Sequence, residues 1–249
     1  NQGIKEVTLL GQIVDRYGMD IPEFPSLARL IELIHPIEGL KRIRFLTSHP
    51  NWMDDNLLET VARLPKAMPY FELPIQSGDN EVLQRMRRGY TTEKFMNIIE
   101  HIRSIFSKVS IITDIIVGFP GENREQFENT LKLLEELRPD MTHIARYSPR
   151  PGTYAAESLA DDVPAEEKMH RFKLIEKAQK KISTDINLHY LGKQTPVLFE
   201  DKRRNRWGGR TPTNKLVFVE SEKNLRGKIM PIEITWTGPW SMIGSLLNL

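Results

Sequence analysis

Residues 109–122 read VSIITDIIVGFPGE, an apolar run rich in β-branched residues that passes directly into a turn of glycine and proline. The run predicts a β-strand over 109–117. Similar runs predict four more strands, with helical spacing of apolar residues between them, at 6–10, 42–47, 70–74 and 141–147. Successive strands begin about 30–40 residues apart, which is the length of a βαβ unit and predicts a parallel sheet. Five such units without an internal repeat predict a β/α barrel or part of one.

A change of pattern near residue 188 predicts a second domain. Pro164, followed by acidic residues, predicts the first turn of a helix that runs to about His189. Beyond it, turns of Gly, Asn and Pro separate short strands predicted at 196–200, 216–220, 228–235 and 241–246. We therefore predict domains at 1–187 and 188–249, the second a small all-β barrel of the OB-like type.

Composition excludes several classes of protein. The 249 residues contain no cysteine, so disulfides, cysteine catalysis and iron–sulfur ligation by this sequence are excluded. No apolar run approaches the about 20 residues of a membrane span, and no signal peptide is recognisable, so we expect a cytoplasmic protein. The net charge is +5 from residue 188 onward and −3 before it. A near-neutral body with a basic end is common in enzymes that act on nucleic acids.

Polar loops follow all five predicted strands, where β/α barrels carry their reactive groups. Gly, Pro and Ser dominate turns in any case, so each loop alone could be a plain turn. Together they favour a binding site, because each loop also carries a residue untypical of turns: Gln12, His49, Gln76, Glu122 and Arg150. Such a rim offers hydroxyls and amides to a ribose, Arg150 to a carboxylate, and glycines that let the backbone approach a flat ring.

Other kinds of site are absent from the sequence. It has no serine-hydrolase spacing, no His-Glu-x-x-His motif, no pair of clustered histidines for zinc, and no Walker or dinucleotide fingerprint. We interpret the histidines of the predicted helices as surface or packing residues, and His143, in the middle of a strand, as a core residue.

The loops and their strands resemble the radical-SAM methylthiotransferases, and most closely the MiaB-type tRNA branch. The resemblance is carried by residues 44–50 (RFLTSHP), 73–79 (LPIQSGD), 113–122 (TDIIVGFPGE) and 147–153 (YSPRPGT). Residues 7–12, 87–91 and 161–164 also fit this branch, and 209–211 with 214–215 resemble its RNA-binding TRAM domain. The resemblance covers essentially the whole sequence.

This resemblance implies an α/β fold: a partial (βα)6 radical-SAM barrel of the TIM type without its first strand, followed by an OB-like TRAM barrel. The implied enzyme uses S-adenosylmethionine (SAM) and two 4Fe–4S clusters. It replaces a C–H bond with a methylthio group on an N6-isopentenyl-adenosine next to the tRNA anticodon. The implied partners are the anticodon stem-loop of tRNA and an electron donor such as flavodoxin or ferredoxin, and we expect a monomer.

The resemblance also implies a set of site residues. Those implied to bind SAM are Gln12, Ser48, His49, Gln76, Ser77, Asp114, Gly118, Glu122 and Arg150. A basic run that would usually be a solvated face is here expected to contact RNA through Lys202, Arg203, Arg204, Arg206 and Arg210. We expect Trp236 and Trp240 to be core or interface residues rather than stacking platforms for bases.

One departure from the family is important. The family holds its radical-SAM cluster on Cys-x3-Cys-x2-Cys before the position of Asn1, and this sequence has no cysteine. We therefore expect a member truncated on its N-terminal side, inactive alone and prone to aggregate at an exposed strand edge. Two alternatives stay open. One is a sister enzyme for threonylcarbamoyl-adenosine or a ribosomal-protein aspartate, which residues 86–91 and 150–153 disfavour. The other is a cluster-free RNA-binding module.

Overall fold

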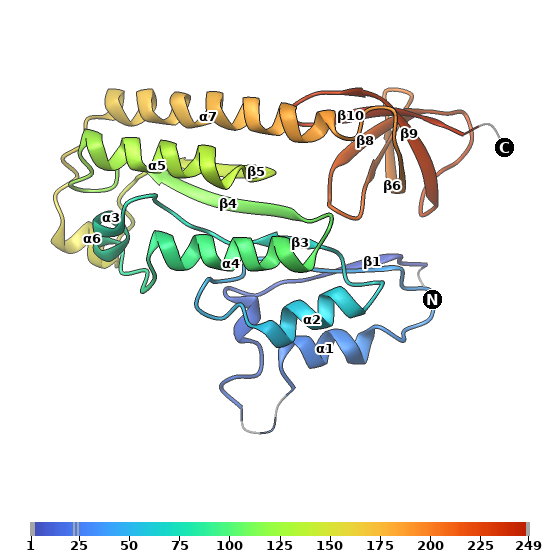
Figure 1. Ribbon diagram of the computed structural model, residues 1–249, viewed down its shortest axis with the longest axis horizontal. Coiled ribbons are helices and arrows are strands. Elements are labelled where there is room, and N and C mark those ends of the chain that lie inside the picture. The colour runs from blue at the N-terminus through green and yellow to red at the C-terminus, as the bar shows by residue number, and fades with distance from the viewer. Residues whose placement is uncertain (1–2, 22, 24, 248–249) are drawn as a thin grey trace.

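The computed structural model describes residues 3–21, 23 and 25–247. Its first part is an open barrel of parallel strands with helices on the outside (Figure 1), which confirms the predicted partial TIM-like barrel. The strands are β1 (Glu6–Leu9), β2 (Arg42–Phe45), β3 (Tyr70–Glu72), β4 (Ser110–Val117) and β5 (Met141–Arg146). β1 pairs with β2, and β3, β4 and β5 pair in that order. Backbone hydrogen bonds between Ile43 and residues 66 and 68 join the two sheets.

The helices follow the strands and begin at side-chain caps. Ser26, Asp54, Asp79, Thr91 and Asn123 each accept a backbone N–H of the first turn. The helical elements are η1 (Val14–Arg16), α1 (Leu27–Ile34), α2 (Asp55–Arg63), α3 (Asn80–Arg85), α4 (Thr92–Ile105), α5 (Arg124–Leu137), α6 (Tyr154–Ser158) and α7 (Ala165–Leu188). No helix in the described part of the chain combines the length and the hydropathy needed to cross a membrane.

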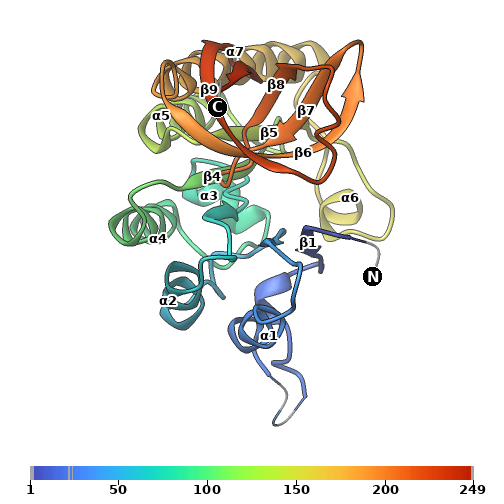
Figure 2. The ribbon, with the colours of Figure 1, turned by 90° about the vertical axis from the view of Figure 1, so that its right-hand side faces the viewer.

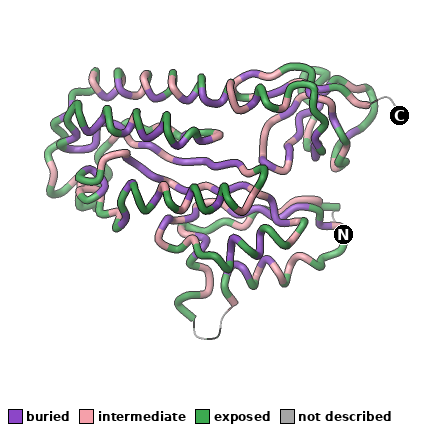
Figure 3. Tube along the Cα trace, viewed as in Figure 1, coloured by how far each residue is buried: buried purple, intermediate pink, exposed green. Residues whose placement is uncertain are grey.

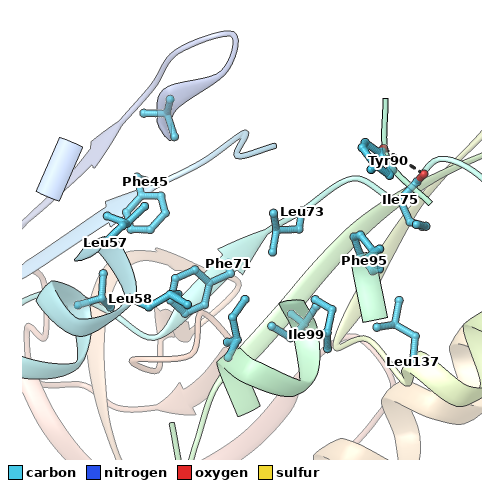
Figure 4. Packing of buried hydrophobic residues seen from close by; sticks show 14 of the residues in the cluster. Phe45, Leu57, Leu58, Phe71, Leu73, Ile75, Tyr90, Phe95, Ile99 and Leu137 are labelled. Atoms are coloured by element: carbon cyan, nitrogen blue, oxygen red, sulfur yellow. Dashed lines mark hydrogen bonds between the residues drawn. The ribbon is translucent and has the colours of Figure 1, made fainter. Parts of the chain in front are cut away.

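The main core lies between the strands and the helices that cover them. Phe45 and Phe71 meet edge to face with ring centroids 5.8 Å apart, and Phe95 and Ile99 of α4 belong to the same cluster (Figure 4). Most of β4 is buried, as Figure 3 shows, because helices or neighbouring strands cover both of its faces. The expectation that His143 is a core residue is wrong. It is exposed, on the face of β5 opposite to Thr142, which is buried against Gln179 of α7.

The second part is a closed five-stranded barrel. Its strands are β6 (Gln194–Arg203), β7 (Arg206–Arg210), β8 (Leu216–Glu220), β9 (Ile229–Thr237) and β10 (Met242–Leu246), closed in the order β10-β8-β7-β6-β9. Sequence patterns did not predict β7. The basic run is a hairpin in which Arg204 and Asn205 form a two-residue turn with φ of 47° and 65°. Trp236 and Trp240 are 50% and 48% exposed, so they are not core residues, and their expected role at an interface stays a prediction.

The closed barrel covers the amino-terminal ends of the parallel strands (Figures 1 and 2). The buried guanidinium of Arg42 donates to the carbonyls of Arg210 (2.7 Å) and Pro196 (3.1 Å). That of Arg44 donates to Thr211 and Pro212 carbonyls at 2.8 and 2.7 Å. We call these contacts the arginine clamp. Glu6 offsets the buried charge by accepting from Arg44 at 2.9 Å, and burial lowers the pKa of Arg42 to about 10.

The clamp predicts a large effect from one substitution. Arg44→Met should lower the free energy of unfolding by about 3–5 kcal/mol, because it removes one partner of a buried charged network and leaves Glu6 Oε1 and two carbonyls without their donor. Urea unfolding measures the change. Arg63→Met is the control, since Arg63 is paired with Glu32 on the surface and should cost less than about 1 kcal/mol. Equal effects of the two substitutions would contradict a stabilising clamp.

Candidate functional site

Five loops meet at the carboxyl ends of the parallel strands, at the end of the molecule opposite the closed barrel. In Figure 1 this rim is at the left, where α3 and α6 lie. The loops follow β1 to β5 in turn, because parallel strands place all their carboxyl ends at one edge. The rim is therefore where the predicted site residues come together, although their side chains do not all face the same way.

Ser48 and Gln76 each bring a buried oxygen to this rim without a hydrogen-bond partner. Ser48 is 2% and Gln76 6% exposed, and neither Ser48 Oγ nor Gln76 Oε1 has a partner within the described chain. The backbone of Gln76 has φ of 72° and is fixed by bonds from its N–H to the Asp114 carbonyl and from the Ile116 N–H to its own carbonyl. A buried polar atom without a partner is costly. These two oxygens therefore fit a polar ligand, such as an adenosine with hydroxyl and amino groups.

Acidic residues face the inside of the open barrel below the rim. Burial raises the pKa of Asp114, and the charges of His143 and Arg88 oppose that shift. Burial also raises the pKa of Glu72, which the nearby Asp114 carboxylate raises further. Sequence reasoning did not single out Glu72 or Arg88. The alternation of inward and outward residues along β3 could have identified Glu72, but nothing local places Arg88 beside Asp114.

Asp15 is another residue that sequence reasoning missed. It lies in η1, is buried, and its Oδ2 accepts the backbone N–H of His49 at 2.9 Å. Its Oδ1 has no partner within the described chain. Burial raises the pKa of Asp15 to about 6. Burial also lowers the pKa of His49, to which the charges of Arg88 and Lys94 add, so a neutral imidazole is favoured.

Three of the predicted SAM residues are engaged within the fold itself. Ser77 Oγ lies 3.2 Å from Thr130 Oγ1 of α5. Glu122 is buried, and its Oε2 accepts the Gly118 N–H and the Arg171 guanidinium, each at 2.6 Å. Burial raises the pKa of Glu122, while these two donors oppose the shift. Gly118 has φ of 69° and packs against the Lys168 stem. Gly118 and Glu122 thus shape the loop after β4, whereas Ser77 ties the loop after β3 to α5.

The remaining predicted residues are exposed, apart from the half-buried Arg210. Gln12 and Arg150 lie open to solvent in the first and last rim loops. On the closed barrel, Lys202, Arg203 and Arg206 are ion-paired with Glu222, Asp201 and Glu220. Arg210 donates to the Asn214 carbonyl, whereas Arg204 forms the exposed hairpin turn. The basic run is thus more neutralised than its sequence indicates.

No iron–sulfur cluster fits this chain. The sequence has no cysteine, and the described residues hold no group of three or more His, Asp or Glu that could ligate a metal. The rim holds two buried oxygens without partners, but its polar groups do not fit a cluster.

The loop after β4 predicts a contrast between two glycines. A Cβ on Gly118 would lie 2.3 Å from Lys168 Cγ, whereas a Cβ on Gly152 would have no neighbour within 4 Å, and both residues have positive φ. Gly118→Ala should therefore lower the free energy of unfolding by about 1–3 kcal/mol more than Gly152→Ala. Thermal or urea unfolding of the two variants measures the difference. Equal losses of unfolding free energy would contradict this prediction, because they would show that the Lys168 side chain can move away without an energetic penalty.

The raised pKa of Asp15 predicts a pH-dependent stability. Between about pH 4 and 6 the folded protein keeps a proton that the unfolded chain has released, so ionisation of Asp15 lowers the free energy of unfolding as the pH rises. Asp15→Asn stays neutral and keeps an acceptor for His49. It should be more stable than the parent by about 1–3 kcal/mol at pH 7, and the difference should vanish toward pH 4. A difference independent of pH in urea unfolding would contradict the assignment.

Comparison with known proteins agrees with this geometry. The family model described as the Radical SAM superfamily matches residues 1–134, just over half of the chain. A protein of Herpetosiphon aurantiacus named tRNA-2-methylthio-N(6)-dimethylallyladenosine synthase is 50% identical over 99% of this chain and 57% of its own length. A protein of the same name from Roseiflexus is 48% identical over 98% of this chain and 52% of its own length. The chain thus spans about half the length of the curated relatives it matches.

A solved structure shares the fold. Coproporphyrinogen III oxidase from Escherichia coli, described as a Radical SAM enzyme, aligns with a TM-score of 0.51 at 22% identity. The alignment covers 64% of this chain and 37% of that chain. With the family model and the open barrel, these similarities show that the chain belongs to the Radical SAM superfamily.

Proposed function

We propose that this chain is the SAM-binding barrel and the RNA-binding end of a tRNA methylthiotransferase. The reaction would add a methylthio group to N6-isopentenyl-adenosine next to the anticodon. One observation carries the proposal: relatives named for this synthase match the chain across both barrels, at 46–50% identity over 98–100% of its length. The rim supports the proposal, because the buried Ser48 Oγ and Gln76 Oε1 lack hydrogen-bond partners that a polar ligand would supply.

Within this proposal the SAM site lies at the rim. Gln12, Ser48, His49, Gln76, Asp114 and Arg150 would contact SAM, with the backbone at Gly118 beside the adenine. Ser77 and Glu122 would hold the loops in shape, because their oxygens already bond to Thr130, Gly118 and Arg171. The Asp114 carboxylate, half-buried and facing inward, is suited to accept from ribose hydroxyls.

SAM bound with a 4Fe–4S cluster would supply the radical chemistry. The cluster ligands would have to come from outside these 249 residues, because the sequence has no cysteine. Two clusters, as in the methylthiotransferases that the chain resembles, are part of the proposal. So are a flavodoxin or ferredoxin as electron donor, a monomeric state and a cytoplasmic location.

The closed barrel would be a TRAM domain that binds the anticodon stem-loop of tRNA. We place the boundary between domains 1–187 and 188–249, where α7 ends and the turn before β6 begins. Lys202, Arg203, Arg204, Arg206 and Arg210 would meet RNA phosphates. Ion pairs already engage Lys202, Arg203 and Arg206, so these contacts would have to displace carboxylates.

A chimera tests the proposed activity. In the Herpetosiphon aurantiacus relative, the matching 57% would be replaced by this chain, and the chimera expressed in bacteria that lack tRNA methylthiolation. Mass spectrometry of digested tRNA should then show 2-methylthio-N6-isopentenyl-adenosine. Gln76→Ala should lower its yield at least about tenfold, since one good polar contact is worth about 1.5 kcal/mol, whereas Gln84→Ala, on the exposed face of α3, should not.

Two results would contradict the proposal. Methylthiolation of threonylcarbamoyl-adenosine instead would assign the chain to the sister enzymes. A folded chimera that holds its clusters and modifies no nucleoside would favour the RNA-binding module without chemistry.

A further inference from the structure

Two arginine side chains lie over exposed aromatic rings at the rim. The Arg16 guanidinium lies 4.9 Å from the centre of the Trp52 ring, and the Arg87 guanidinium 3.3 Å from that of Tyr154. Trp52 is 37% and Tyr154 43% exposed. The four residues come from four different rim loops, those after β1, β2, β3 and β5. The two stacked pairs are therefore products of the tertiary fold and not of local sequence.

The two pairs lie along one continuous part of the rim. Asn51, next to Trp52, donates from its Nδ2 to the Gly89 carbonyl at 3.1 Å, and so ties the second loop to the turn that carries Arg87. Lys94 Nζ donates a hydrogen bond to Oδ1 of the same Asn51 side chain at 2.7 Å. Tyr154 begins α6, in the segment after β5, and its contact with Arg87 joins that segment to this part of the rim. We call this line, from Arg16 and Trp52 to Arg87 and Tyr154, the stacking arc.

The charges of the arc are not neutralised within the described chain. In the described chain, Arg16 and Arg87 have no carboxylate within ion-pair distance. The same holds for Arg88, which lies near Asp114. Three of the five cations that the sequence marked for RNA binding do have such a carboxylate. A guanidinium stacked on a ring keeps its N–H edge free for a phosphate, and stacking limits the entropy lost on binding.

We propose that the stacking arc binds the single-stranded loop of the RNA substrate. Arg16 and Arg87 would donate to loop phosphates, and Trp52 and Tyr154 would present ring surfaces to unstacked bases beside the target nucleotide. Unpaired loops are the RNA elements whose bases can leave the helix and stack on aromatic side chains. This assignment rests on the proposed function. It places part of the RNA-binding surface at the rim of the first barrel, in addition to the closed barrel.

The test is binding of a fluorescent anticodon stem-loop RNA to the 249-residue chain, measured by anisotropy over a range of salt concentrations. Arg16→Ala and Arg87→Ala should each weaken binding about tenfold and lower the salt slope by about one. Tyr154→Leu and Trp52→Leu should weaken binding of the stem-loop but not of a duplex without a loop. Arg124→Ala is the matched control, since Arg124 is exposed, paired with Glu128 and outside the arc.

The RNA-binding measurements test the stacking arc independently of the proposed enzymatic activity. If the arc variants bind the stem-loop as the parent does while Lys202→Ala or Arg206→Ala weakens binding, the arc is not an RNA site. The proposed activity then stands or falls on the nucleoside analysis of the chimera. If Tyr154→Leu and Trp52→Leu weaken duplex binding equally, the aromatic rings do not stack on loop bases and the inference is wrong. Retained urea stability of each variant shows that a loss of binding is not a loss of fold.

Discussion

All five strands of the first barrel run in the same direction, and this constraint determines where the other parts of the molecule can lie. Parallel strands need crossover helices, so the helices cover the outside and every connecting loop after a strand emerges at one end. That end gathers Ser48, His49 and Gln76 from loops distant in sequence, near Asp114 of β4. The opposite end meets the closed barrel instead. Chemistry and domain docking are thus separated along the strand axis.

The rim is locally less favourable for stability than the rest of the fold. It holds unpartnered buried oxygens on Ser48 and Gln76, positive φ at Thr47 and Gln76, and an Asp15 carboxyl whose pKa burial has raised. Such features are costly unless a ligand completes them. The capped helices and the phenylalanine core behind the rim supply the stability that lets these groups persist without partners of their own.

Local patterns were sufficient for the architecture and insufficient for much of the site. The apolar runs identified all five parallel strands, most clearly β2 and β4, because burial on both faces leaves a clear signal in sequence. Pro164 and the acidic residues after it identified the start of the long helix α7. They missed β7, whose glycines and arginines resemble a loop, and they misplaced His143 in the core. Asp15 meets His49 from 34 residues away, and Arg88 meets Asp114 from 26 residues away. No periodicity encodes such contacts, nor does it encode the ion pair between Arg206 of β7 and Glu220 of β8.

The two sides of the arginine clamp contribute different kinds of group. Its donors are two side chains of β2, but its acceptors on the closed barrel are all main-chain carbonyls, those of Pro196, Arg210, Thr211 and Pro212. A carbonyl is kept through any substitution that preserves the backbone, so this surface of the closed barrel can change its residues freely while Arg42 and Arg44 cannot be replaced. Closed barrels from divergent homologues should therefore be interchangeable on one first barrel. The residues of the closed barrel can therefore change in evolution while the arginine clamp that holds it to the first barrel is kept.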